Sequence, residues 1–288
     1  MSKAFNCKYI AKDLKHNIRL RVENFLAKGY KTPHLAVIQV GDDYASSKYV
    51  ASKKKAGVEC GIEVYDFHFG SEITEEMLIT FIKLIGSIKD IHGVMVQLPL
   101  PSHINTQKVL QAIPSEKDVD GFTYEQQGKL AIGDNDLVPC TPKGVIKILC
   151  DMGVELTGKK AVIVGRSNIV GKPLATLLTQ RNATVTLCHS HTEGLKTHLE
   201  DADIVVMAVG KAGMLNSSYK LKEGVILIDV GINRDEDGEL CGDIHISDEL
   251  LENVKYYTPV PGGVGVMTVA MLMHNTYTAY INQVTCNE

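Results

Sequence analysis

The stretch AVIVGRSNIVG, residues 161–171, decides the fold expected of this chain. Its first five residues are typical of a short buried strand, and a helix is predicted from Val170 to Arg181. A tight turn between a strand and a helix directs backbone N–H groups and the positive end of the helix towards a phosphate. The stretch departs from the pattern GxGxxG, because Ser167 stands at the second glycine position and the spacing is longer. Taken alone, it fits an ordinary strand–turn–helix connection as well as a phosphate site.

The sequence after this turn continues the alternation of strand and helix. Short apolar segments at 183–188, 203–209 and 225–230 predict three further strands. This is the layout of a doubly wound nucleotide-binding domain, which favours the phosphate-site interpretation. We therefore expect an α/β protein whose second half is a Rossmann-type domain.

The first half of the chain shows the same rhythm and predicts a parallel sheet with flanking helices. Residues 114–143 are interrupted by prolines and glycines, so we expect connecting and pocket-lining segments there, followed by a helix at about 141–152. A last helix is expected at about 266–282. The predicted elements of the first half are a helix at 8–29, a strand at 34–40, a helix at 46–59, a strand at 62–69, a helix at 72–88 and a strand at 93–97.

Composition and charge narrow the classes of function. The 288 residues are 44% hydrophobic and 22% charged, which is ordinary for a soluble globular protein. A formal net charge of −4 argues against a protein that binds nucleic acid through its phosphates. No apolar run approaches the roughly 18 residues of a membrane span, and the N-terminus lacks a secretory signal. The seven cysteines form no CxxC pair, which fits a reducing compartment. We expect a cytoplasmic protein that binds neither nucleic acid nor membrane.

Two further segments suit a planar substrate that undergoes proton chemistry. In the segment PGGVG, residues 261–265, three glycines leave backbone free to approach a flat ligand. Tyr49 and Lys53 lie four residues apart, so on a helix they share one face. An aromatic ring, a neighbouring amine and a bare backbone loop together suit a heterocycle.

With VQLPL at 96–100 and KDVDG at 117–121, these segments closely resemble the bifunctional methylenetetrahydrofolate dehydrogenase/cyclohydrolase family, from about residue 5 to about residue 282. The resemblance implies NADP-dependent oxidation of 5,10-methylenetetrahydrofolate to the 5,10-methenyl compound, followed by hydrolysis to 10-formyltetrahydrofolate. This one-carbon chemistry feeds purine biosynthesis. It also implies a folate-binding catalytic domain of residues 1–140 and 267–288, an NADP-binding domain of residues 141–266, an active-site cleft between them, and a homodimer.

The resemblance assigns roles at the folate site. Lys53 is expected to carry the proton transfers of the hydrolysis, because a lysine of lowered pKa can accept and return a proton. Gln97 would hold its amine, Tyr49 would stack on the folate ring, and Asp120 would accept hydrogen bonds from the pterin. Asp118 is interpreted as structural. The other expected substrate contacts are Val96, Leu98, Pro261, Gly262, Gly263, Val264 and Gly265.

The residues that follow the predicted strand 183–188 indicate which cofactor is preferred. NAD enzymes usually carry an acid there, whereas this chain has none before Glu193. Family resemblance assigns Arg166 and Ser190 to the 2′-phosphate of NADP. Many relatives carry Arg or Lys where this chain has His191, so we hypothesise that affinity for the 2′-phosphate weakens as pH rises. The expected cofactor-binding residues are Gly165, Arg166, Ser167, Ile169, Ser190 and Ile232.

Several alternatives stay open from the sequence. An NADP-dependent shikimate-type hydroxy-acid dehydrogenase also pairs a substrate domain with a Rossmann domain, but a small polar substrate does not need Tyr49 or PGGVG. A monofunctional dehydrogenase or a non-catalytic nucleotide sensor would be expected to lose Lys53, Gln97 or Asp120. No metal site is predicted, because His189 and His191 lack a third ligand. Cys140 is interpreted as a small buried hydrophobic residue.

Overall fold

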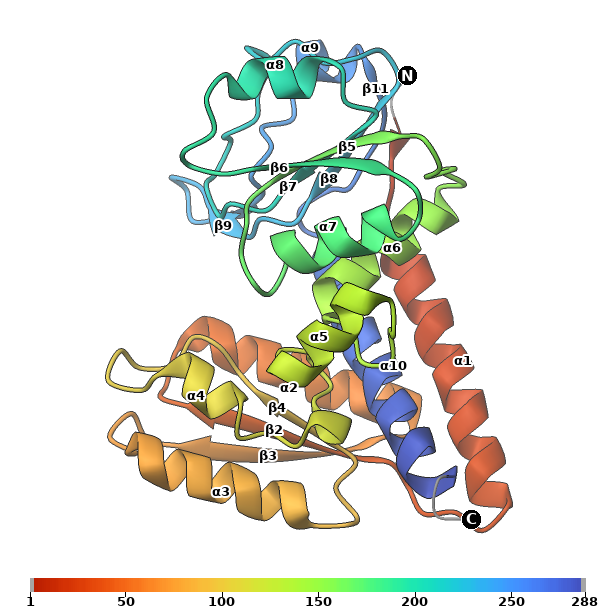
Figure 1. The fold of residues 1–288 in the computed structure, drawn as a ribbon, viewed down its shortest axis with the longest axis vertical. Coiled ribbons are helices and arrows are strands. Elements are labelled where there is room, and N and C mark those ends of the chain that lie inside the picture. The colour runs from red at the N-terminus through yellow and green to blue at the C-terminus, as the bar shows by residue number, and fades with distance from the viewer. Residues whose placement is uncertain (1–2, 286–288) are drawn as a thin grey trace. The chain divides into compact units, whose positions relative to one another are not determined.

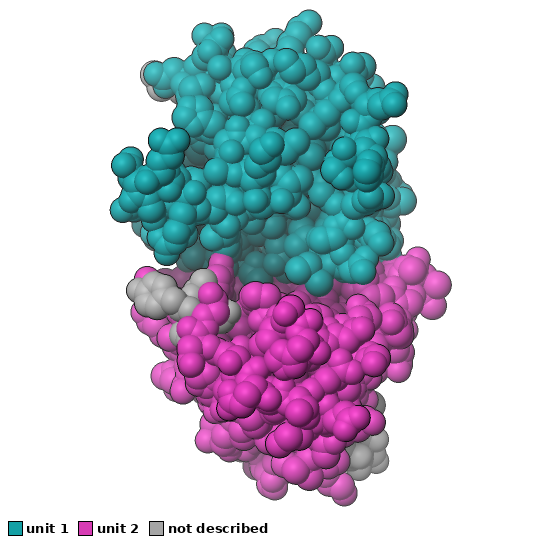
Figure 2. All heavy atoms as spheres, turned by 90° about the vertical axis from the view of Figure 1, so that its left-hand side faces the viewer, with its two compact units in different colours: residues 1–11, 141–268 teal, residues 12–140, 269–288 magenta. Residues whose placement is uncertain are grey.

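The computed structural model describes residues 3–285, except for the side chains of residue 3 and residues 44–47. The chain divides into two compact units, coloured separately in Figure 2. Unit 1 consists of residues 1–11 and 141–268, and unit 2 consists of residues 12–140 and 269–288. Residues 1–11 belong to unit 1, whereas the family resemblance implies that they belong to the folate-binding domain.

Unit 2 is built on a three-stranded sheet with the order β3-β2-β4. Its strands are β2 (His34–Val40), β3 (Glu63–Phe69) and β4 (Gly93–Val96), and both pairings are parallel, as predicted. The central strand β2 is buried along six of its seven residues, which explains its nearly continuous apolar sequence. Parallel pairing brings the carboxyl ends of all three strands to one edge, so Gln97, directly after β4, lies at that edge.

Helices cover this sheet (Figure 1). They include α2 (Tyr44–Cys60) and α3 (Glu75–Ser87). The side chain of Thr74 caps α3 by accepting a hydrogen bond from the N–H of Met77, and the helix buries Leu78, Ile82 and Ile85. Those three side chains join the apolar cluster that also contains the β2 and β4 residues.

Two long helices lie side by side in Figure 1 although they come from opposite ends of the chain. They are α1 (Lys8–Ala27) and α10 (Val264–Thr285). Phe25 of α1 packs edge-on against Tyr277 and Tyr280 of α10, with ring centroids 6.3 and 6.0 Å apart. Edge-to-face contacts at these distances are favourable aromatic geometry.

The prediction of connecting segments over residues 114–143 is wrong where they form a short 3-10 turn (Ser115–Lys117) and α5 (Tyr124–Ile132). The helix expected at about 141–152 is α6 (Cys140–Asp151), and α4 (Thr106–Leu110) precedes this region. The side chain of Thr123 accepts from the N–H of Gln126, and Gly133 ends α5 in the left-handed region. A threonine followed three residues later by glutamine, with a glycine after the last turn, is the start and stop signal of a helix.

Unit 1 contains a six-stranded parallel sheet with the order β1-β11-β8-β7-β5-β6. The sequence predicted four of its strands: β5 (Lys160–Val164), β6 (Thr184–Cys188), β7 (Ile204–Met207) and β8 (Val225–Asp229). The strands β11 (Val254–Tyr257) and β1 (Lys3–Ala4), of which β1 forms an edge of the sheet, were not predicted. The remaining elements are α7 (Gly171–Thr179), α8 (Leu195–Glu200), α9 (Asp248–Leu251) and the antiparallel pair β9 (Asn233–Arg234) and β10 (Leu240–Cys241).

The strand order confirms the doubly wound architecture. After β5 the chain pairs β6 on one side of it and β7 on the other, and such a switch in direction leaves a crevice at the carboxyl ends of the strands. Gly165 follows β5 there with φ of 126°, and a Cβ at this position would lie 2.1 Å from the carbonyl oxygen of Ala208. The turn therefore requires glycine.

Candidate active site

Lys53 has a buried amine in unit 2. Its residue is 8% exposed, although Lys54 and Lys55 beside it on α2 are exposed. Its Nζ donates a hydrogen bond of 2.6 Å to Oε1 of Gln97. Tyr49, one helical turn earlier, is partly buried, and burial raises the pKa of its phenol. The spacing therefore brings a ring and an amine to one face of α2.

Hydrogen bonds engage the backbone N–H of Gln97 and both the oxygen and the nitrogen of its side-chain amide. Its backbone N–H donates to the carbonyl of Ile38 on β2 at 2.8 Å, which extends the sheet by one residue. Its Nε2 donates to the carbonyl of Leu98 at 2.7 Å, so Oε1 is the atom presented to Lys53. Val96, one residue earlier, is 1% exposed and anchors this strand end in the core. Gln97 is thus a fixed acceptor for the Lys53 amine.

Asp120 lies close enough to Lys53 for each charge to act on the other. Burial lowers the pKa of Lys53, and the negative charge of Asp120 opposes part of that shift. Burial raises the pKa of Asp120, and the charge of Lys53 opposes it in turn. A lysine whose pKa is lowered in this way gives up its proton more readily than a solvated lysine does.

Asp118 has the structural position that the sequence analysis gave it. It is fully buried, and its carboxylate accepts hydrogen bonds from the backbone N–H groups of Gly121 at 2.9 Å and Thr123 at 2.6 Å. Burial raises its pKa to about 6. Gly121 has φ of 68°, and a Cβ there would lie 2.5 Å from the carbonyl oxygen of Leu137. Asp118 therefore folds the turn that presents Asp120.

Two polar residues around Asp120 were missed by the sequence analysis. Cys140 is buried, as predicted, but its thiol hydrogen-bonds the Asp120 side chain and lowers the pKa of that carboxyl. Its Sγ also contacts the carbonyl of Val119 at 3.3 Å. Asn275 of α10 donates from Nδ2 to the carbonyls of Val119 and Val138, both at 2.8 Å. The only signal in the sequence was a polar residue in an apolar helix, and 135 positions separate the two side chains.

The first group of predicted cofactor residues forms a compact turn in unit 1. Oγ of Ser167 accepts from the N–H groups of Val170 at 3.1 Å and Gly171 at 3.4 Å, and so caps the start of α7. A Cβ at Gly171 would lie 1.9 Å from the carbonyl oxygen of Gly165, so the turn is tighter than a side chain would permit. Ile169 is 39% exposed at its outer edge. The geometry fits a diphosphate seated on backbone at the helix start.

A basic cluster follows β5 and β6. Val164 and Cys188 are register partners, and the N–H of Gly165 donates to the carbonyl of Cys188 at 2.9 Å. Arg166 and the segment 189–191 therefore follow neighbouring strand ends. Desolvation, with the positive charges of Arg166 and His191, lowers the pKa of His189. The Arg166 guanidinium and the Ser190 hydroxyl, which follow neighbouring strand ends, fit a phosphate ester.

Ile232 and the glycine loop also lie in unit 1. Ile232 is 47% exposed after β8, and a Cβ at Gly265 would contact its Cδ1 at 3.7 Å. Gly262 has φ of 109°, and a Cβ at Gly263 would lie 2.6 Å from the carbonyl oxygen of Pro259. The prediction that α10 begins near Val266 is correct to within two residues, because it begins at Val264.

The predicted site residues thus fall into two groups. Unit 2 brings together Tyr49, Lys53, Val96, Gln97, Leu98 and Asp120, whereas unit 1 holds Gly165, Arg166, Ser167, Ile169, Ser190, Ile232 and residues 261–265. Within residues 3–285, no three His, Cys, Asp or Glu side chains gather in a way that would hold a metal ion. Over the same range, no helix has the length and apolar character needed to cross a membrane.

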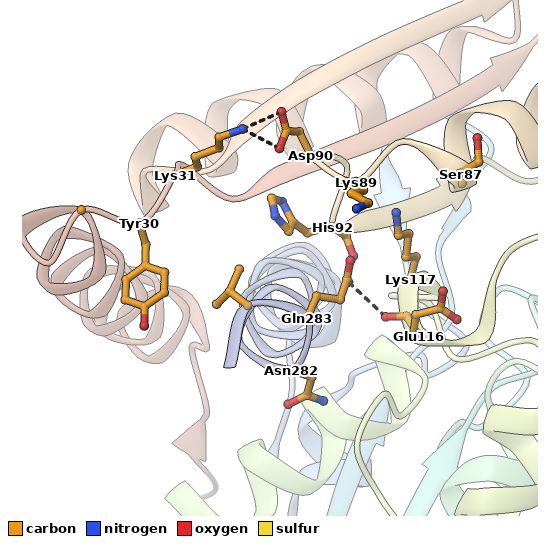
Figure 3. A pocket seen from close by; sticks show the side chains of 13 residues that line it. Tyr30, Lys31, Ser87, Lys89, Asp90, His92, Glu116, Lys117, Asn282 and Gln283 are labelled. Carbon is orange, nitrogen blue, oxygen red and sulfur yellow. Dashed lines mark hydrogen bonds and ion pairs between the residues drawn. The ribbon is translucent and has the colours of Figure 1, made fainter. Parts of the chain in front are cut away.

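Lys117, the first residue of the KDVDG motif, lines a pocket of unit 2 whose lining includes neither Lys53 nor Asp120 (Figure 3). It is 6% exposed, and its Nζ donates to the carbonyl of Ile88 at 2.7 Å. His92, from the segment before β4, lies in the same pocket with Nδ1 accepting from the N–H of His34 at 3.1 Å. Burial, with the charges of His34, Lys117 and Lys31, lowers the pKa of His92 to about 4.

This histidine makes stability depend on acidity. The folded protein binds the His92 proton only near pH 4, whereas an unfolded chain binds it at about pH 6.5, so stability is lost as pH falls between those values. We expect wild type to lose about 2 to 3 kcal/mol more than His92→Gln between pH 7.5 and 4.5, measured by urea unfolding. His16→Gln, at an exposed position of unit 2, is the matched control. Equal losses in wild type and His92→Gln would contradict the prediction.

Two family descriptions match this chain. "Tetrahydrofolate dehydrogenase/cyclohydrolase, catalytic domain" matches residues 5–120, and the corresponding "NAD(P)-binding domain" matches residues 139–284. The bifunctional protein FolD of Bacillus velezensis is 48% identical over 269 residues, covering 93% of this chain and 94% of the relative.

Solved structures agree with these matches. The bifunctional FolD of Campylobacter jejuni is 42% identical with a TM-score of 0.94, covering 98% of this chain and 99% of that chain. The Trypanosoma brucei FolD, complexed with NADP cofactor and inhibitor, is 34% identical with a TM-score of 0.92, covering 98% of each chain. Shikimate 5-dehydrogenase of Thermus thermophilus is 15% identical with a TM-score of 0.53, covering 87% of this chain and 99% of that chain. That last likeness shows the fold alone.

Proposed function

The chain belongs to the tetrahydrofolate dehydrogenase/cyclohydrolase family, and from this premise we propose which of its side chains serve each reaction. The enzyme oxidises 5,10-methylenetetrahydrofolate with NADP and hydrolyses the 5,10-methenyl product to 10-formyltetrahydrofolate. The assignment of roles depends on one observation above all: a buried lysine of lowered pKa is held by Gln97 and faces the charge of Asp120.

In the hydrolysis, Lys53 moves the proton. Water adds to the methenyl carbon, and the neutral amine of Lys53 takes the proton that the water releases. The bond from that carbon to N5 then breaks, N5 takes the proton from Lys53, and the hydroxyl group on the carbon releases its own proton to solvent as it becomes the formyl oxygen on N10. The hydrogen bond of 2.6 Å from Lys53 to Gln97 keeps the amine in one orientation through both transfers.

In both reactions, Asp120 and Tyr49 hold the folate. The Asp120 carboxylate accepts hydrogen bonds from the pterin amino and ring N–H groups, and Asp118 fixes the turn that carries it. Tyr49 offers a partly buried ring for stacking. Val96 and Leu98 support the wall beside Gln97, and the glycines at 262, 263 and 265 supply backbone without Cβ groups.

Unit 1 is proposed to bind NADP, which when bound accepts the hydride from the methylene carbon. The turn of Gly165, Ser167 and Ile169 would hold the diphosphate at the start of α7. Arg166 and Ser190 would hold the 2′-phosphate, and the exposed side chain of Ile232 would contact the nicotinamide end. The cluster of cations around His189 supports the choice of NADP over NAD.

The function is tested by an initial-rate assay with 5,10-methylenetetrahydrofolate, following reduced cofactor and methenyl compound separately with NADP or NAD. We expect NADP to be reduced faster than NAD, with little accumulation of the methenyl compound. Stoichiometric accumulation would remove the hydrolytic role of Lys53. Reduction of neither cofactor would overturn the folate assignment.

The residue at 191, next to Ser190 in the chain, is expected to tune the affinity for NADP. His191→Lys places a permanent positive charge there, so the KM for NADP should fall while the KM for NAD stays unchanged. An unchanged KM for NADP in His191→Lys would contradict this role for position 191.

The proposal also covers the domain boundaries, the cellular compartment and the oligomeric state. Residues 1–140 and 267–288 are proposed as the folate-binding domain and residues 141–266 as the NADP-binding domain, supported by the family matches at 5–120 and 139–284. We also propose a cytoplasmic homodimer that supplies one-carbon units for purine biosynthesis. Sedimentation velocity tests the dimer.

A further inference from the structure

Asp243, two residues after the end of β10, carries a carboxylate with four hydrogen-bond donors around it. The residue is fully buried. Its Oδ2 accepts from the backbone N–H groups of Val209 at 2.7 Å and Gly210 at 3.1 Å. Its Oδ1 accepts from the N–H of Lys211 at 2.7 Å and from Nδ2 of Asn233 at 2.9 Å. One carboxylate thus holds three successive backbone N–H groups and one side-chain amide.

These partners belong to two different loops. Residues 209–211 follow β7, and Asn233 follows β8 after Ile232. The two strands are parallel neighbours with Met207 opposite Asp229, so both loops lie at the ligand-binding edge of the sheet. Each loop presents an exposed apolar side chain, Val209 at 37% and Ile232 at 47%.

A second carboxylate holds Asp243 itself. Asp229 at the end of β8 accepts from the N–H groups of Gly231 at 3.1 Å, Asp243 at 3.0 Å and Ile244 at 2.9 Å. A Cβ at Gly231 would lie 2.2 Å from the Asp243 carboxylate, and a Cβ at Gly242 would lie 1.9 Å from that of Asp229. Each acid therefore occupies a place that a glycine leaves open, and the arrangement is fixed from both sides.

We propose that Asp243 is a positioning residue for hydride transfer, whose carboxylate ties the loops 209–211 and 232–233 together and so fixes the surface against which the nicotinamide ring rests. The inference rests on the proposed binding of NADP to unit 1. Asp243 acts through the loops and does not itself touch the reacting atoms. A displacement of about 1 Å at a reacting centre can lower a rate by about a hundredfold. Hydrogen bonds that hold the two loops in place therefore affect the rate of hydride transfer.

Measuring both activities of this enzyme distinguishes a variant that misplaces the nicotinamide surface from a variant that does not fold. The hydrolysis is assigned to Lys53, Gln97 and Asp120 in unit 2 and transfers no hydride, whereas Asp243 and its partners lie in unit 1. A variant that only unfolds the protein lowers both activities. A variant that misplaces the nicotinamide surface lowers the dehydrogenase alone.

The test compares Asp243→Asn, Asn233→Ser and the control Asp237→Asn, an exposed acid in the same unit. Asp243→Asn places an N–H group against loop N–H groups, so its dehydrogenase kcat should fall about ten- to a hundredfold. The hydrolysis of added 5,10-methenyltetrahydrofolate should stay within about twofold of wild type. Asn233→Ser removes one tie without disturbing a buried charge, and we expect a smaller loss confined to the dehydrogenase. Asp237→Asn should match wild type in both assays.

A second readout follows the chemical step. With substrate deuterated at the methylene carbon, the isotope effect on kcat should increase in Asp243→Asn and Asn233→Ser, because hydride transfer becomes slower relative to product release. An unchanged dehydrogenase kcat in Asn233→Ser would overturn the proposal, whether Asp243→Asn folds or not. So would a rise in the KM for NADP without a fall in kcat. A wild-type protein that fails to reduce NADP would instead refute the proposed function.

Discussion

Lys53→Met is expected to lower the rate of 5,10-methenyltetrahydrofolate hydrolysis by at least about a hundredfold, the usual contribution of a positioned acid–base group. Methionine keeps the length of the side chain but cannot take a proton. The fold should survive, because the substitution removes a charge whose burial already lowers the pKa of Lys53. The rate is measured by the loss of methenyl absorbance, and the fold by thermal unfolding.

The matched control is Lys54→Met, which makes the same change one residue away at an exposed position. It loses only the surface contact of 3.3 Å with Asp66, and its hydrolysis rate should stay at the wild-type value. In wild type the rate should rise with pH through the lowered pKa of Lys53, because the neutral amine is the reactive form. Rapid hydrolysis by Lys53→Met would move the proton transfer to another group.

Asp120→Ala is expected to weaken folate binding by about a hundredfold or more, the scale of losing a charge-assisted bidentate acceptor. Affinity for NADP should stay near normal, because the proposed cofactor residues lie in unit 1. Removing the carboxylate also removes the charge that holds the pKa of Lys53 up, so that pKa should fall further. Calorimetric titration with each ligand measures the two affinities.

Asp134→Ala, at an exposed position of the same unit, controls for the loss of an acid in general. Asp120→Asn keeps the shape and one acceptor oxygen, and an intermediate folate affinity is expected. Equal damage to folate and NADP binding in Asp120→Ala would indicate a folding defect. Unchanged folate affinity would remove Asp120 from the pterin site.

Much of the fold could be predicted because its signals are local. The strands β2, β5 and β8 are short apolar runs buried on both faces, and they pair in parallel as such runs require. The strand β11 was missed because only one of its four residues is buried. Its sequence therefore has neither a continuous apolar run nor a clean alternation.

The functional residues were likewise predicted in part and missed in part. Lys53 was selected by its spacing from Tyr49 and by family resemblance, and the buried hydrogen bond to Gln97 is the contact that the resemblance implied. Asp243 was missed because nothing in its neighbourhood of the sequence resembles a site. Its four partners lie up to 34 residues away and three of them are backbone groups, which carry no signal in the sequence.

The last helix also sets the order in which the protein can be completed during synthesis. Asn275 on α10 hydrogen-bonds the carbonyls of Val119 and Val138, the hydroxyl of Tyr280 donates to the carbonyl of Lys31, and Gln283 donates to the carbonyl of His92. A ribosome produces all of these acceptors long before it produces the donors. Unit 2, which carries Lys53 and Asp120, therefore waits with open backbone acceptors until nearly the whole chain has emerged. The strands β5 to β8 of unit 1 are complete at residue 229, before any of these donors has been made. A nascent chain thus contains these four strands before α10 completes its contacts in unit 2.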